Sequence, residues 1–310
     1  MKIHNHNIDT FDSSCEIQDV INRLNELVKT GGYVFRGYGK QDEMRPRLIR
    51  DKDYTNLEGK LLKDFEKYGS SYFHASTPID FMSYAQHFGL PTRLLDFTYN
   101  PFIALSFALY SSKFGSNYSN PEDINYYYIR YASIKENLVL QTLPVYEGEP
   151  LEKQLQRDSL AVQALQAIRI INAVYGYNQL NHTTDSFFSA MAVFNGINDK
   201  ILAERKIKDK AILFVDPNQS NQRIIMQQGL FMFPYTLSKD EHERIIQNNS
   251  HYIMIHKKFR DDLIQYLDTL GYNTFRLMPD LSSICKAVER RNIDERSKKR
   301  TLFKKKGEEL

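Results

Sequence analysis

The stretch QHFGLPTRLLD, residues 86–96, places five polar side chains, a glycine and a proline directly before an apolar segment. Glycine and proline interrupt regular structure, and binding residues lie in loops more often than in helices or strands. We therefore interpret the stretch as a binding loop, with candidate ligand contacts at His87, Thr92, Arg93 and Asp96. Asn100-Pro101 follows, a pair suited to cap and begin a helix, so we expect Asp96 to lie just before a helix N-terminus.

Hydrophobic spacing along the rest of the chain predicts an α+β fold. Apolar residues at helical spacing follow a capping-box sequence at Ser13–Glu16 and end at Gly31-Gly32. Further helices are expected near residues 57–65, 68–85 with a break at Pro78, and 281–288. Short β-branched or aromatic runs predict strands at Tyr33–Arg36, Tyr126–Tyr131, Ala211–Val215, Gly229–Phe233, His251–Ile255 and Tyr272–Leu277.

These elements predict a central mixed or antiparallel sheet of short strands flanked by helices. Residues 1–32 form an N-terminal helix in this interpretation, and residues 33–289 form the main domain. A mainly helical insertion is expected at about 151–205 within that domain. The basic segment 290–310 is expected to be a disordered tail, because runs of charge are usually solvated.

Composition narrows the classes of function. The chain has 310 residues, 42% of them apolar, and its net charge of +3 gives no general argument for a nucleic-acid partner. Two cysteines are too few for a disulfide framework or a zinc site. The sequence contains neither a signal-peptide pattern nor a run of about 20 apolar residues that could span a membrane. We expect a cytoplasmic protein with no membrane partner.

Arg36 and Gly37 form a second candidate site, at the end of a predicted strand. A guanidinium beside a residue without a Cβ would let a diphosphate or a ribose approach the backbone. The alternative is an arginine that pairs with a buried carboxylate. Asp96 has two interpretations as well, since it could orient an arginine or bind a ribose hydroxyl, or else cap a turn in an ion pair with Arg93. His87 could act as an acid, a base or a ribose contact, although most such histidines are half-buried and structural.

Several spaced motifs agree with one another. They are Phe35-Arg36-Gly37 and the segments 44–50 (MRPRLIR), 86–96, 223–231 (RIIMQQGLF) and 277–281 (LMPDL). In sequence and order they resemble the FRG domain family, named for its Phe-Arg-Gly signature. A set of motifs in the right order is more specific than any one of them.

The resemblance implies a distant similarity to ADP-ribosyltransferases, and with it an ADP-ribosyltransferase-like sheet and NAD as the substrate. In such enzymes an arginine or histidine on the first strand holds NAD, and Arg36 is the matching position here. The residues that would then bind NAD are Arg36, Gly37, His87, Thr92 and Arg93.

The resemblance also implies a catalytic glutamate near Gln228, where this chain has an amide. Cleavage of the nicotinamide bond passes through an oxocarbenium-like transition state, which a carboxylate stabilises. Three possibilities follow: a carboxylate from elsewhere, with Asp96 the first choice, catalysis by positioning, or no catalysis. The candidate catalytic residues are Arg36, Asp96 and Gln228.

The leading expectation is therefore an NAD-dependent ADP-ribosyltransferase with an unknown acceptor, either nucleic acid or protein. By the resemblance it would be a bacterial toxin or phage-defence effector. The alternative is a non-catalytic module that binds a nucleotide or nucleic acid through the same arginines and the basic tail.

Overall fold

The computed structural model describes residues 4–5, 8–39, 44–50, 54, 57–69, 71–72, 78–111, 125–134, 138–141, 212–217, 222–234, 237–281, 283–285, 287–289 and 292. The predicted helical insertion at 151–205 lies outside these residues, and so does the predicted basic tail apart from residue 292. No helix in the described part of the chain is long and apolar enough to cross a membrane.

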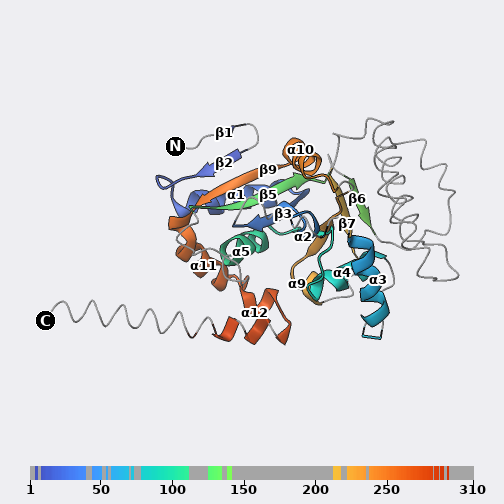
Figure 1. The fold of residues 1–310 in the computed structure, drawn as a ribbon. Helices are drawn as coiled ribbons and strands as arrows, with labels where there is room; N and C mark the ends of the chain where they lie inside the picture. Colours follow the sequence, from blue (N-terminus) through green and yellow to red (C-terminus); the bar gives the residue numbers. More distant parts are fainter. Residues whose placement is uncertain are drawn as a thin grey trace, which may run out of the picture.

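Nine strands among the described residues form one mixed sheet, which helices flank in Figure 1. The order of the strands is β1-β2-β9-β5-β3-β4-β8-β7-β6. Their bounds are β1 His4–Asn5, β2 Ile8–Phe11, β3 Tyr33–Tyr38, β4 Leu95–Thr98, β5 Tyr126–Ser133, β6 Leu138–Gln141, β7 Leu213–Asp216, β8 Gly229–Met232 and β9 His251–His256. The β2–β9 and β6–β7 pairs are parallel and the other pairs are antiparallel. Helices flank this sheet, so the predicted α+β class with a mixed sheet is confirmed.

Three helices cover one face of the sheet: α1 (Ile17–Thr30), α5 (Pro101–Ser111) and α11 (Arg260–Thr269). Their apolar sides pack on alternate residues of the central strands, among them Phe35, Ile129 and Ile253. Successive side chains of a strand point to opposite faces, so only every second residue joins this core.

The opposite face is covered by α10 (Lys239–Asn249). Ile245 and Ile246 of this helix share a second core with the intervening strand residues, including Val34, Leu95 and Phe97. The sheet therefore separates two layers of side chains, and each strand contributes alternately to both.

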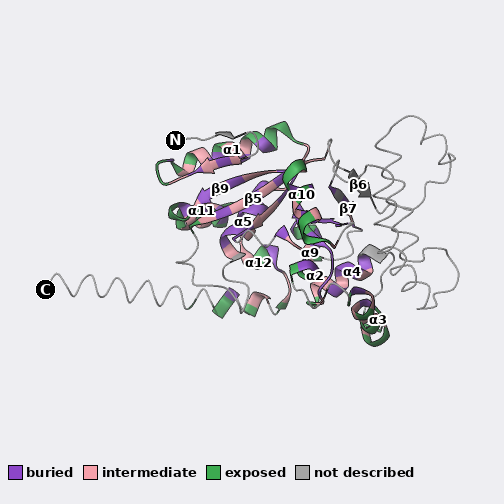
Figure 2. Cartoon of the chain, turned by 45° about the horizontal axis from the view of Figure 1, so that its top comes forward, coloured by how far each residue is buried: buried purple, intermediate pink, exposed green. Residues whose placement is uncertain are grey.

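Four more of the described helices are α2 (Arg47–Arg50), α3 (Glu58–Gly69), α4 (Pro78–His87) and α9 (Gln222–Met226). Of these, α4 and α9 face the strands β4 and β8. Helix α3 buries Glu58 and Leu62, and its other residues are half-buried or exposed (Figure 2). Helix α4 begins at Pro78, where the sequence predicts the break, because proline is well suited to a first helical turn.

Two helix starts can be compared with their predicted caps. The Asn100 side chain accepts hydrogen bonds from the backbone N–H groups of Phe102 at 2.9 Å and Ile103 at 3.4 Å, as expected. The cap of α1 is Glu16 rather than Ser13, and its backbone N–H donates to the Asp19 carboxylate at 3.1 Å. The Ser14 hydroxyl does not cap α1 either, because it donates to the Asp12 carboxylate in the preceding turn.

Three segments differ from the prediction. Residues 4–5 and 8–11, which the prediction assigns to an N-terminal helix unit, form strands β1 and β2 of the central sheet. Residues 272–277 do not form a strand, because Asn273 accepts a hydrogen bond from the Arg276 N–H and caps the short helix α12 (Thr274–Leu277). The stretch 86–96 is not one loop either, since α4 ends at His87 and β4 begins at Leu95. Leu95 and Phe97 are buried on one face of β4, which places Asp96 on the other face.

Helix α5 lies unusually close to strand β3, and Gly37 is the reason. A Cβ added at Gly37 would stand 1.6 Å from the carbonyl oxygen of Ala104 and 2.8 Å from the backbone nitrogen of Ala108. Both contacts are with helix backbone, which cannot turn aside as a side chain can. The glycine therefore serves helix-on-sheet packing, which corrects the predicted role of Gly37 in letting a ligand approach the backbone.

Replacing Gly37 with alanine should lower the free energy of unfolding by at least about 2 kcal/mol, because α5 must move away from the sheet. Urea denaturation followed by circular dichroism measures this. Gly229→Ala is the matched control, since a Cβ there meets its nearest atom, the Ile224 carbonyl oxygen, at an ordinary 3.5 Å. Equal stability losses for the two variants would contradict the close approach of α5.

Candidate functional site

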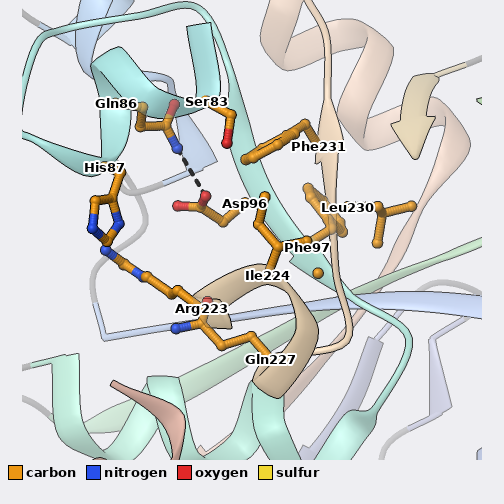
Figure 3. A pocket seen from close by; sticks show the side chains of 11 residues that line it. Ser83, Gln86, His87, Asp96, Phe97, Arg223, Ile224, Gln227, Leu230 and Phe231 are labelled. Atoms are coloured by element: carbon orange, nitrogen blue, oxygen red, sulfur yellow. Dashed lines mark hydrogen bonds between the residues drawn. The ribbon is translucent and has the colours of Figure 1, made fainter. Parts of the chain in front are cut away.

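A cavity of about 140 Å³ lies where α4 and α9 face strands β4 and β8 (Figure 3). Its lining residues are Ser83, Gln86 and His87 from α4, Asp96 and Phe97 from β4, Arg223, Ile224 and Gln227 in and after α9, and Gly229, Leu230 and Phe231 from β8. A cavity of about 150 Å³ holds a molecule of the size of benzene. This cavity therefore has room for one planar ring or one sugar.

Asp96 is held in the wall of the cavity by a short relay of hydrogen bonds. Its carboxylate accepts from the Gln86 amide at 2.8 Å (Figure 3), and the Gln86 carbonyl oxygen accepts from the Thr92 hydroxyl at 2.5 Å. Thr92 is itself buried and accepts from the Leu94 N–H. Thr92 thus lies behind the site and orients Gln86, while Asp96 remains exposed on the cavity side.

His87 stands at the edge of the cavity, where α4 ends. Burial lowers the pKa of its imidazole, and the nearby Arg223 charge lowers it further, against the opposite effects of Asp280 and Asp96. The imidazole is therefore neutral near pH 7. Its Nδ1 is buried and has no hydrogen-bond partner among the described residues.

Arg223 is the charged lining residue that the sequence interpretation missed, although the quoted segment 223–231 begins with it. Its side chain extends from α9 towards His87 (Figure 3). The signal that could have identified it is the four-residue spacing to Gln227, which places both on one side of a helical turn. Arg223 gives the cavity a cation opposite the Asp96 carboxylate.

Arg36 lies next to this site but is not part of the lining. Its Nη1 donates to the backbone carbonyl oxygen of Asp96 at 2.7 Å, which ties β3 to β4 where their ladder ends. Arg36 therefore positions the strand that carries Asp96, and Gly37 faces α5 instead.

Arg93 is not available to a phosphate. Its side chain is fully buried, with Nε donating to Glu58 Oε1 at 2.7 Å and Nη2 paired to Glu58 Oε2. The guanidinium also lies 5.3 Å from the centre of the Phe233 ring and donates to the Pro234 carbonyl oxygen. This corrects both predictions for Arg93, since it neither faces a ligand site nor pairs with Asp96, and it instead joins α3 to the segment after β8.

Gln228 is exposed and does not line the cavity. It adopts a left-handed backbone with φ of 47°, and its carbonyl oxygen accepts from the Tyr99 N–H at 3.0 Å. The neighbouring Gln227 faces the cavity, and its amide donates to the Leu277 carbonyl oxygen at 2.8 Å. Among the described lining residues, Asp96 is the only carboxylate.

The Arg93–Glu58 ion pair predicts a strong thermodynamic coupling. Arg93→Met should cost about 3–5 kcal/mol of unfolding free energy, because it leaves the Glu58 charge buried without a partner. Adding Glu58→Met to that variant should recover a large part of the loss. Chemical denaturation of the two single variants and the double variant measures the coupling. The control is the pair Arg260–Asp261, whose carboxylate side chain is 91% exposed and whose coupling should be less than about 1 kcal/mol. Strictly additive losses would refute the coupling.

The charges around His87 predict two opposite pKa changes. Arg223→Gln should raise the pKa of His87, because it removes a cation that disfavours protonation, and Asp96→Asn should lower it. A proton NMR titration of the imidazole C–H signals measures both. His242, whose pKa burial also lowers, lies near Arg45 and should titrate unchanged in the same spectra. Shifts of the same sign in the two variants would contradict this placement of charges.

Comparison with known proteins gives one match. No curated protein and no solved structure is significantly similar to this chain. The matching family model runs from β3 to just beyond α5, so it includes Arg36 and Asp96 but not Arg223. Residues 31–115 match the FRG domain, and the chain therefore carries an FRG domain.

Proposed function

We propose that this protein is an NAD-dependent ADP-ribosyltransferase and that the cavity between α4 and α9 receives the ribose of NAD that carries the nicotinamide. The observation that carries the proposal is the Asp96 carboxylate, held by Gln86 in the wall of a cavity with room for one ring. A carboxylate beside the ribose is what the oxocarbenium-like transition state of this cleavage requires.

In the proposed reaction the bond between the ribose C1′ and the nicotinamide nitrogen breaks, and its electron pair leaves with nicotinamide. Asp96 stabilises the positive charge that develops at C1′. A nucleophile of the acceptor then forms a bond to C1′ and loses its proton. Asp96 takes the role that a glutamate near Gln228 would have had, because Gln228 does not line the cavity.

Arg223 and His87 have supporting roles in this proposal. The Arg223 guanidinium suits the diphosphate of NAD, since its fork can donate two hydrogen bonds to phosphate oxygens. The neutral His87 can hydrogen-bond a ribose hydroxyl without adding a second positive charge. Arg36 contributes by fixing the backbone of Asp96.

A non-catalytic nucleotide-binding module is the second candidate. The observation that favours it is that Asp96 already accepts a hydrogen bond from Gln86, while the described lining offers no second carboxylate to activate an acceptor. A ring-sized cavity beside a cation suits a nucleotide that is bound and not cleaved. The acceptor, a nucleic acid or a protein, and the role as a toxin or phage-defence effector stay predictions from the family resemblance.

Release of nicotinamide from labelled NAD tests the proposal. Asp96→Asn should reduce the rate by about 100-fold or more at saturating NAD, because the transition-state charge loses its partner. Arg223→Gln should weaken NAD binding about tenfold or more and change the maximal rate little. Purified protein is assayed with protein and nucleic-acid fractions offered as acceptors.

Gln228→Asn is the matched control, because it keeps an amide and tolerates the left-handed backbone, and it should retain wild-type release. Loss of release in this control, with Asp96→Asn unaffected, would refute the assignment to Asp96. Saturable NAD binding without release in any acceptor fraction would refute the transferase and establish the binding module.

A further inference from the structure

A second cavity, of about 470 Å³, lies on the opposite face of the sheet, between the central strands and α10. It is more than three times larger than the cavity beside Asp96, and its volume falls in the range of small-molecule sites. Its floor carries Tyr38, Tyr128, Arg130 and Tyr252 from β3, β5 and β9. The proposed NAD cleavage makes no use of any of these residues.

Arg130 is the central polar group of this floor. Its guanidinium lies 4.7 Å from the centre of the Tyr252 ring, and Nη1 donates to the Ser250 hydroxyl at 3.4 Å. It also hydrogen-bonds Tyr38, whose pKa burial raises and the Arg130 charge lowers. The remaining Nε is buried without a hydrogen-bond partner among the described residues. An unsatisfied buried donor of this kind calls for a ligand oxygen or water.

The charges around this cavity favour an anion. Arg130 stands directly opposite Arg36 in the β3–β5 ladder, and like charges at opposed positions repel each other. A second lining arginine, Arg45, forms an ion pair with Glu243, whose side chain is 41% exposed. His242 adds no charge, because burial and the nearby Arg45 charge lower the pKa of its imidazole, against the opposite effect of the Met44 carbonyl oxygen, which Nε2 contacts at 2.9 Å. The lining thus carries two cations and one carboxylate.

Rigid aromatic surfaces complete the cavity. The rings of Tyr38 and Tyr128 are stacked, with centroids 5.4 Å apart and planes 12° apart. Such surfaces pack against the apolar faces of a sugar or a base, whereas the arginine forks bind the oxygens of a planar or tetrahedral anion. A dianion suits the site better than a single carboxylate, because it must compete with Glu243 for Arg45.

We propose that this second cavity binds a small organic phosphate monoester, with Arg130 as the principal contact of the phosphate and Arg45 as the second. The shared chemistry is a dianionic phosphate on a sugar or nucleoside that packs against the half-buried Tyr128 and Tyr252, because Tyr38, stacked on Tyr128, is only 2% exposed. The site lies on the other face of the sheet from Asp96, so binding there is separate from the proposed cleavage of NAD.

Calorimetric titration of the full chain with AMP, ribose 5-phosphate and inorganic phosphate tests the proposal. Binding of AMP or ribose 5-phosphate more tightly than inorganic phosphate is expected, and AMP as the tighter of the two would identify a nucleotide. Arg130→Gln should weaken binding about tenfold or more, and Arg130→Lys should restore part of it. Glu243→Gln should tighten binding about two- to fivefold, because it frees Arg45 from its partner.

Arg223→Gln is the control for the first cavity and should leave this titration unchanged, whereas Arg130→Gln should leave nicotinamide release unchanged. Absence of binding at millimolar concentrations of all three probes would overturn the proposal. Equal affinities of wild type and Arg130→Gln, or loss of binding in Arg223→Gln instead, would overturn it as well. The titration reports on this site even where NAD is not cleaved, so the two proposals fail separately.

Discussion

The contact between α5 and β3 at Gly37 is the constraint on which the arrangement of the cavities depends. Helix α5 begins shortly after the end of β4, and Asn100 caps its N-terminus. The position of α5 on β3 therefore also limits where β4 can lie. Because Gly37 has no side chain, helix backbone reaches the strand at that point. Arg36, the preceding residue, then reaches the backbone of Asp96 and ties β4 alongside β3.

The alternation of strand residues converts this packing into two separate sites. In β4, Leu95 and Phe97 enter the core under α10, and Asp96 between them faces α4 and α9. In β5, Ile129 enters the core under α5, and Arg130 faces the cavity beside α10. A shift of one residue in either strand would move its charged side chain into a hydrophobic core, so the register of the sheet is strongly determined.

Local patterns predicted much of the fold, and the failures have physical causes. The helix at Asn100-Pro101 and the strand at Tyr33 depend on neighbours in sequence, and both are confirmed. The segment 272–277 has strand-like residues, but the cap from Asn273 decides for a helix.

Ion pairing was least predictable, because Glu58 lies 35 residues from Arg93 and only the packing of α3 brings them together. Asp96 was predicted as a site residue from its polar surroundings. Its partner Gln86 was not, because the contact depends on where α4 ends relative to β4.

The cavity beside Asp96 is assembled from two distant parts of the chain. Strand β4 and helix α4 lie within the residues matched by the FRG model, whereas α9 and β8 lie more than 100 residues later. The two parts meet because β4 pairs with β8, with Asp96 opposite Phe231. The carboxylate and its supporting relay therefore come from the matched part, and the cation Arg223 comes from outside it. The proposed chemistry needs charge on both sides of the ligand, so residues 31–115 by themselves do not form the site. The pairing of β4 with β8 is the folding step that brings the two charges together.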